Sequence, residues 1–97
     1  NLDEILTVPD IDVYFVAPSD LSQTMGHIGN AGHPDVLKAI DEAIAKITRA
    51  GKVAGTLVTS GSVEEYQQKG VQFLMTPWVA WVAQGGAEFV KKVGSPR

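Results

Sequence analysis

Three short runs of apolar residues recur along the chain, and each is followed by a segment with helical character. They span residues 12–17 (DVYFVA), 52–59 (KVAGTLVT) and 71–76 (VQFLMT). They are nearly continuously apolar rather than alternating, which is typical of strands buried on both faces of a parallel sheet. Strands that alternate with helices predict an α/β fold with parallel strands and right-handed crossovers.

Prolines, glycines and spacing mark the helices between these runs. Residues 2–6 indicate the end of a helix. The clearest helix begins at Pro34, because proline fits the first helical position, and it ends before Gly51. Its apolar residues recur at three- and four-residue spacing: Val36, Leu37, Ile40, Ala43, Ile44 and Ile47. A shorter helix follows the second run, where Ser62 and Glu65 have the spacing of a capping box.

The last helix is expected to begin at Pro77 and to carry a broad apolar stripe. Gly85 and Gly86 lie within it and weaken it by up to about 1 kcal/mol each. The stripe consists of Trp78, Trp81, Val82, Phe89, Val90 and Val93. Three strand–helix units cannot close a barrel, so an incomplete sheet would leave this stripe exposed. We therefore expect a homo-oligomer that forms through the last helix.

The composition excludes several classes of protein. A chain of 97 residues can form one modest core, so residues 1–97 are interpreted as one structural unit. A net charge of -3 with 20% charged residues argues against a nucleic-acid partner, and no apolar run approaches the roughly 20 residues of a membrane span. The absence of cysteine fits a cytoplasmic location. Because the chain starts without methionine inside a helix-like segment, we expect it to be part of a longer protein.

Asp20 follows the first run by three residues, at the place where parallel α/β sheets bind their ligands. A carboxylate there can bind a divalent cation such as Mg²⁺, and the backbone N–H groups around Ser19 could bind a substrate carboxylate. The alternative is that Asp20 caps a short helix within a long loop between Pro18 and His33. Spacing alone favours the cap, since one carboxylate is too little for a metal site.

Residues 13–40 closely resemble the metal-dependent class II pyruvate aldolases of the HpcH/HpaI family. That family includes 2-dehydro-3-deoxyglucarate aldolase and 4-hydroxy-2-oxoheptanedioate aldolase. The resemblance rests on F-x-x-P-[SA]-D-L-S at residues 15–22, on G-x-x-G-N-x-x-H-P at residues 26–34 and on AGK at residues 50–52. It implies a (β/α)8 TIM barrel of the phosphoenolpyruvate/pyruvate-binding type. This chain would supply the three C-terminal βα units of that barrel.

The resemblance also implies an activity and a site. The expected reaction cleaves 2-oxo-3-deoxy sugar diacids or 4-hydroxy-2-oxo acids, which are small-molecule 2-oxo acid substrates, to pyruvate and an aldehyde. Asp20 would bind the divalent metal, with Mg²⁺ expected and Mn²⁺ or Co²⁺ as alternatives. The Ser19 N–H would contact the pyruvyl carboxylate, and Leu57 would line the pocket. The metal would act as a Lewis acid on the enolate that forms as the bond breaks.

The family's second metal-binding carboxylate, its catalytic histidine and its substrate-binding arginine precede Asn1 in this alignment. No catalytic residue is therefore assigned within this chain, which we expect to be inactive alone. His33 is interpreted as a cap or loop-packing residue, and His27 as structural with substrate-loop contact as the alternative. Trp78 and Trp81 are assigned to the core or a subunit interface, with a cap over the pocket as the alternative. The rival function is a non-catalytic oligomerising module in which Asp20 only caps a helix.

Overall fold

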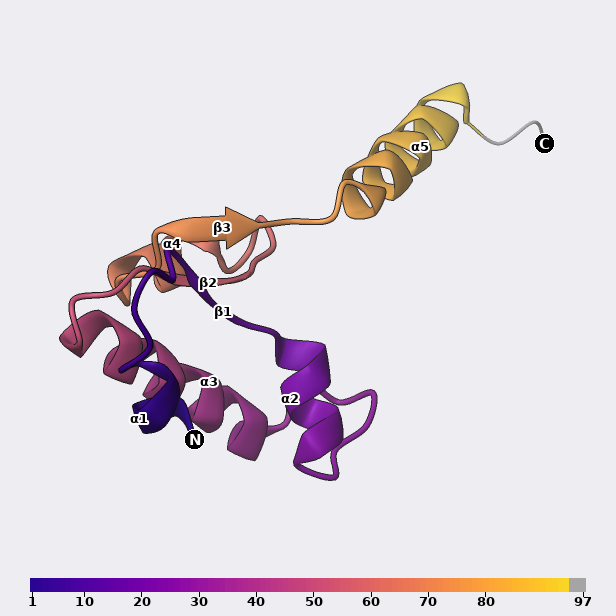
Figure 1. Ribbon diagram of the computed structural model, residues 1–97. Coiled ribbons are helices and arrows are strands. Elements are labelled where there is room, and N and C mark those ends of the chain that lie inside the picture. The colour runs from indigo at the N-terminus through magenta and orange to yellow at the C-terminus, as the bar shows by residue number, and fades with distance from the viewer. Residues whose placement is uncertain (95–97) are drawn as a thin grey trace.

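The structure, a computed structural model, describes residues 1–94 and confirms the α/β fold with parallel strands (Figure 1). Helices and strands lie close to the segments that the sequence predicts. Their order is α1 (Leu2–Ile5), β1 (Tyr14–Val16), α2 (Pro18–Thr24), α3 (Pro34–Arg49), β2 (Ala54–Leu57), α4 (Val63–Gln68), β3 (Phe73–Met75) and α5 (Val79–Val93).

The sheet contains the three strands in the order β1-β2-β3, and both pairs are parallel. Tyr14 pairs with Ala54, and Gly55 pairs with Phe73. A buried side chain adds a bond to the backbone ladder: the Thr56 hydroxyl donates to the Val16 carbonyl oxygen at 2.8 Å. Because the strands are parallel, their carboxyl ends meet at the same edge of the sheet.

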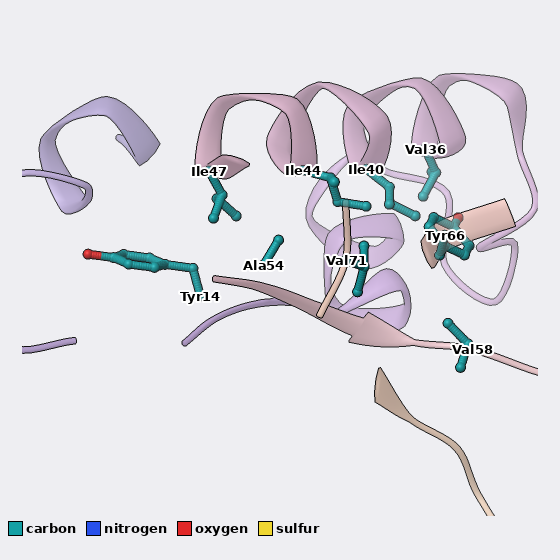
Figure 2. Close-up of a cluster of buried hydrophobic side chains, with 9 residues drawn as sticks. All are labelled: Tyr14, Val36, Ile40, Ile44, Ile47, Ala54, Val58, Tyr66 and Val71. Atoms are coloured by element: carbon teal, nitrogen blue, oxygen red, sulfur yellow. The ribbon is translucent and has the colours of Figure 1, made fainter. Parts of the chain in front are cut away.

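Helix α3 covers one face of this sheet and supplies four of the nine residues of the hydrophobic core (Figure 2). Val36, Ile40, Ile44 and Ile47 are at most 1% exposed, so the predicted apolar face is confirmed. Burying each of these side chains stabilises the fold by about 1.5–3 kcal/mol. Around them lie Tyr14, Ala54, Val58, Tyr66 and Val71.

The opposite face of the sheet is open to solvent at β1 and β3, so the prediction that the strands are buried on both faces is wrong for these two strands; it is confirmed for β2, in which residues 54–56 are all buried. Phe15, Phe73 and Met75 are 39%, 47% and 50% exposed. Side chains alternate along a strand, so these residues point away from α3. No helix among residues 1–94 covers them, and the apolar runs of β1 and β3 therefore have a packing layer on one side only.

Helix α5 projects away from the rest of the chain, as Figure 1 shows. The radius of gyration is 17.2 Å, against roughly 12–13 Å for a compact domain of this length. The helix begins at Val79, with Trp78 as its N-cap, two residues later than predicted, and it continues through Gly85 and Gly86. All six residues of its apolar stripe are at least 56% exposed. Along residues 1–94, every helix is too short or too polar to cross a membrane.

One local prediction is corrected. Ser62 is the N-cap of α4, but it does not form the capping box with Glu65. Its hydroxyl instead accepts a hydrogen bond from the Thr59 N–H at 3.0 Å, within the turn that precedes the helix. The short helix considered within the loop after Pro18 is present as α2, whose seven residues occupy the first part of that segment.

Candidate functional site

Asp20 lies in the first turn of α2, directly after β1. Ala17 is the N-cap in an extended conformation and Pro18 is the first helical residue, so the Leu21 N–H donates to the Ala17 carbonyl at 3.0 Å. The interpretation of Asp20 as an N-cap is therefore wrong. The physical reason is that the fixed φ of proline starts the helix at Pro18, which places Asp20 inside it.

The Asp20 carboxylate is exposed, and no hydrogen bond within residues 1–94 involves it. Its charge is favourable near the positive end of the α2 dipole. The Ser19 N–H belongs to the same first turn, whose amides have no partner within the helix. Both groups can therefore bind an external ligand without breaking an internal bond.

Hydrogen bonds within α2 hold this turn in place. The Ser22 hydroxyl, 1% exposed, donates to the Ser19 carbonyl at 2.7 Å, and the Thr24 hydroxyl donates to the Asp20 carbonyl at 3.0 Å. Sequence reasoning missed Ser22, although its spacing of three from Ser19 is the usual signal for such a bond in a helix. Asp20 also lines an open hollow of about 370 Å³ together with Val16 and Leu21.

Leu57 is the last residue of β2 and pairs with Met75 in the parallel register. It lies on the face of the sheet that α3 leaves open, which it shares with Phe15 and Phe73. The rings of Phe15 and Phe73 meet edge to face, with centroids 6.3 Å apart. The structure thus places Leu57 at the carboxyl end of β2 and Asp20 just after the carboxyl end of the adjacent strand β1. The hollow at Asp20 is also lined by two alanines of α3, and Leu57 is not among its lining residues.

The two tryptophans do not belong to the core of the described chain. Trp78 is 65% exposed and Trp81 is 56% exposed. Trp81 lines a small pocket of about 110 Å³ beside the residues that follow β2 and β3, which include Thr59, Ser60 and Thr76. The core assignment is therefore corrected, while an interface and a cap over the pocket both stay predictions.

The loop after α2 brings His27 and His33 together. Their rings are stacked with centroids 3.7 Å apart and planes inclined by 16°. His33 is the N-cap of α3 and its Nδ1 accepts the Asp35 N–H at 3.1 Å, so the predicted capping role is confirmed. Sequence reasoning missed Asp35, whose carboxylate lies 3.7 Å from His27 Nε2 and 3.8 Å from His33 Nδ1. In the sequence, the only indication that Asp35 lies beside the histidines is its spacing of two residues from His33.

Lys69 links α3 to α4 and has no catalytic geometry. Its Nζ lies 2.8 Å from Asp41 and 2.9 Å from Glu65. The hydrogen bond to Asp41, followed by the one to Glu65, raises the pKa of the Lys69 ammonium well above its ordinary value. A Schiff-base lysine needs a neutral amine, so the charged Lys69 is unsuited to that role.

Comparison with known proteins identifies relatives over most of the chain. Residues 1–76 match the sequence model of the family described as HpcH/HpaI aldolase/citrate lyase. The hydroxypyruvate/pyruvate aldolase of Roseovarius nubinhibens is 43% identical over 74 residues, which cover 75% of this chain and 29% of that protein. A 2-keto-3-deoxy-L-rhamnonate aldolase of Escherichia coli is 50% identical over 60 residues, which cover 62% of this chain and 22% of that protein.

A solved structure extends the likeness to the fold. The HpcH/HpaI aldolase/citrate lyase family protein from Burkholderia cenocepacia superposes with a TM-score of 0.87 at 27% sequence identity. The superposition covers 97% of this chain, and therefore includes α5, but only 37% of the other. The three parallel strands and their helices thus match a part of a TIM-barrel structure, and the chain spans less than a third of the two curated relatives described above.

Proposed function

This chain belongs to the HpcH/HpaI aldolase/citrate lyase family, and on that premise we propose that it is part of a metal-dependent aldolase. The proposed reaction cleaves 4-hydroxy-2-oxo acids or 2-oxo-3-deoxy sugar diacids to pyruvate and an aldehyde. Two relatives support the substrate class, because the hydroxypyruvate/pyruvate aldolase and the 2-keto-3-deoxy-L-rhamnonate aldolase are both named for 2-oxo acids. The observation that carries the proposal is the free Asp20 carboxylate at the carboxyl end of β1.

Asp20 is the residue that would hold the metal in this chain. Its carboxylate is exposed and unpartnered among residues 1–94, and carboxylate oxygen is the donor that Mg²⁺ prefers; Mn²⁺ and Co²⁺ are alternatives. When bound, the ion would stabilise the negative charge that develops on the 2-oxo oxygen as the C3–C4 bond breaks. A single carboxylate is too few for a site, so we propose that further protein ligands, the catalytic histidine and the arginine come from outside these 97 residues.

The chain's own residues would bind and orient the substrate beside Asp20. The Ser19 N–H, unpaired within α2, would donate to the pyruvyl carboxylate. Leu57 would form the apolar side of the pocket on the open face of the sheet. We propose no general base in this chain, because His33 is engaged as a cap and His27 is stacked on it.

Self-association through α5 is the second part of the proposal. Trp78, Phe89 and Val93 are 65–72% exposed, which is unusual for large apolar residues on one helix of a soluble protein. The B. cenocepacia structure superposes over 97% of the chain, so α5 has a similar placement there. The rival function, a non-catalytic oligomerising module, rests on the same helix. A cytoplasmic location remains part of the proposal, in agreement with the absence of cysteine.

The test is Asp20→Asn in the complete protein that contains this chain, with pyruvate release measured as a function of added Mg²⁺. We expect metal-dependent activity to be lost, because the substitution keeps the size of the side chain and removes its charge. Asp12→Asn is the matched control, since Asp12 is an exposed aspartate just before the other end of β1. Metal-dependent activity retained in Asp20→Asn would contradict the role of Asp20, and a metal-independent wild type would contradict the reaction class.

A further inference from the structure

We propose that His27, His33 and Asp35 form a binding site for a transition-metal ion of the Zn²⁺ type, separate from the metal proposed at Asp20. Within the part of the chain that the structure describes, these three side chains offer ligand atoms that all lie within 4.8 Å of one another. They come from the loop after α2 and from the first turn of α3.

The distances between the ligand atoms are close to those of a metal site. Zn²⁺ holds nitrogen and oxygen ligands at about 2.0–2.2 Å, so tetrahedral ligands lie about 3.3–3.6 Å apart. The Asp35 carboxylate oxygen lies 3.7 Å from His27 Nε2 and 3.8 Å from His33 Nδ1. Binding of one ion would require these distances to shorten by a few tenths of an ångström and at least one ring to rotate out of the stack, because the in-plane lone pairs of stacked imidazoles do not converge on one point.

The loop backbone holds the two imidazoles together. The His27 N–H donates to the Ser22 carbonyl at 2.7 Å, and the His27 carbonyl accepts the Asn30 N–H at 2.9 Å. The Asn30 carbonyl in turn accepts the His33 N–H at 3.1 Å. The chain therefore does not need to order a long loop when the ion binds, which removes part of the entropic cost of forming the site.

The donor set selects the kind of ion. Two imidazoles and one carboxylate suit Zn²⁺, Ni²⁺ or Cu²⁺, whereas Mg²⁺ prefers oxygen ligands. The side chains of His27 and His33 are 29% and 31% exposed, so water can occupy a fourth position. An excess of Mg²⁺ should therefore occupy Asp20 without blocking this cluster.

Two features of the cluster limit the affinity. The His33 Nδ1 lone pair already accepts the Asp35 N–H, so an ion at that atom must replace the N-cap hydrogen bond. The positive end of the α3 dipole also opposes a cation, and the charge of the Asp35 carboxylate offsets it. We therefore expect binding that is weaker than that of a closed structural zinc site.

The test is calorimetric titration of the protein with Zn²⁺ in excess Mg²⁺, with four variants. His27→Ala and Asp35→Asn should each weaken Zn²⁺ binding by at least about tenfold, since even outer-shell substitutions commonly cost 10–100-fold. Asp20→Asn and Glu64→Gln, which remove exposed carboxylates elsewhere, should leave the affinity unchanged. An unchanged affinity in His27→Ala, or loss of binding in Asp20→Asn, would overturn the proposal.

A second measurement does not depend on the folding of any variant. Long-range ¹H–¹⁵N spectra of the wild type should show Zn²⁺-dependent shifts of both imidazoles. Zn²⁺ bound without a change in either histidine would place the ion elsewhere and refute the site. These results are independent of the aldolase proposal, which depends on Asp20 and Mg²⁺.

Discussion

Gly55 lies at the centre of the sheet, where β2 passes closest to Phe73. A Cβ built at Gly55 would lie 3.0 Å from Phe73 Cδ1 and 3.1 Å from both Phe73 Cβ and the Phe73 carbonyl oxygen. Ordinary contacts begin near 3.4 Å, so Gly55→Ala forces a shift of about 0.3–0.4 Å. The ring could move alone, but the carbonyl cannot, because neighbouring ladder bonds join Gln72 to Ala54 and Val58 to Met75.

The expected loss of stability follows from two opposing terms. Overpacking typically costs about 1–3 kcal/mol, while replacing glycine by alanine gains about 0.4–1 kcal/mol by restricting the unfolded chain. We therefore expect Gly55→Ala to lower the free energy of unfolding by about 1–2 kcal/mol. The free energy of unfolding can be measured by urea denaturation monitored by far-UV circular dichroism. Tryptophan fluorescence is a poor probe here, because both tryptophans are exposed and would report little on the core.

Gly61→Ala is the matched control for this experiment. A Cβ there would approach only the Thr59 hydroxyl, at 3.8 Å, and the backbone of Gly61 does not have a positive φ. The same exchange should leave stability unchanged or raise it by up to about 1 kcal/mol. Equal effects of the two substitutions, or no loss for Gly55→Ala, would refute the argument that Phe73 requires a glycine at this position.

Two further predictions concern Lys69 and α5. Lys69→Met should lower stability by no more than about 1 kcal/mol at neutral pH, because the pair with Asp41 is partly exposed. Because the pKa of Lys69 is raised in the folded state, its charge contributes fully to the free energy of unfolding below the ordinary pKa of 10.5. This contribution is lost as the pH rises through the higher pKa of the folded state. The wild type should therefore lose stability in alkali that the variant does not lose. Phe89→Glu should reduce the mass measured by light scattering, because it places a charge in the exposed apolar stripe of α5. Glu88→Gln, on the same helix, should leave the mass unchanged. An equal mass for both variants and the wild type would contradict association through α5.

The order of strands and helices could be predicted from the sequence because each element carries a strong local signal. Pro34, the spacing of Ile40 and Ile44, and Gly51 define α3 without reference to the rest of the chain. The position of Asp20 just after β1 could also be predicted, because a parallel sheet binds its ligands at that edge. Local signals thus predicted the helix and the place of Asp20, whereas the assignment of Asp20 as a metal ligand came from the family resemblance.

Features that depend on distant packing could not be predicted in the same way. An apolar run such as that of β3 indicates two buried faces, but it does not say which layer covers each face. The contact between His27 and Asp35 depends on a loop that turns twice, with Gly26 and Gly29 at φ values of 82° and 73°. Composition indicates a flexible segment there, and only the fold shows which side chains meet.

The burial pattern has a consequence for the order in which the chain matures. Val71 is the last buried residue, and every residue from Gln72 to Gly94 is exposed. Because synthesis runs from the N-terminus to the C-terminus, every buried side chain of the described core has left the ribosome once Val71 has, while β3 and α5 are still being synthesised. Contacts made by α5 would therefore form after this core has been supplied, and self-association through α5 would be a later and concentration-dependent step.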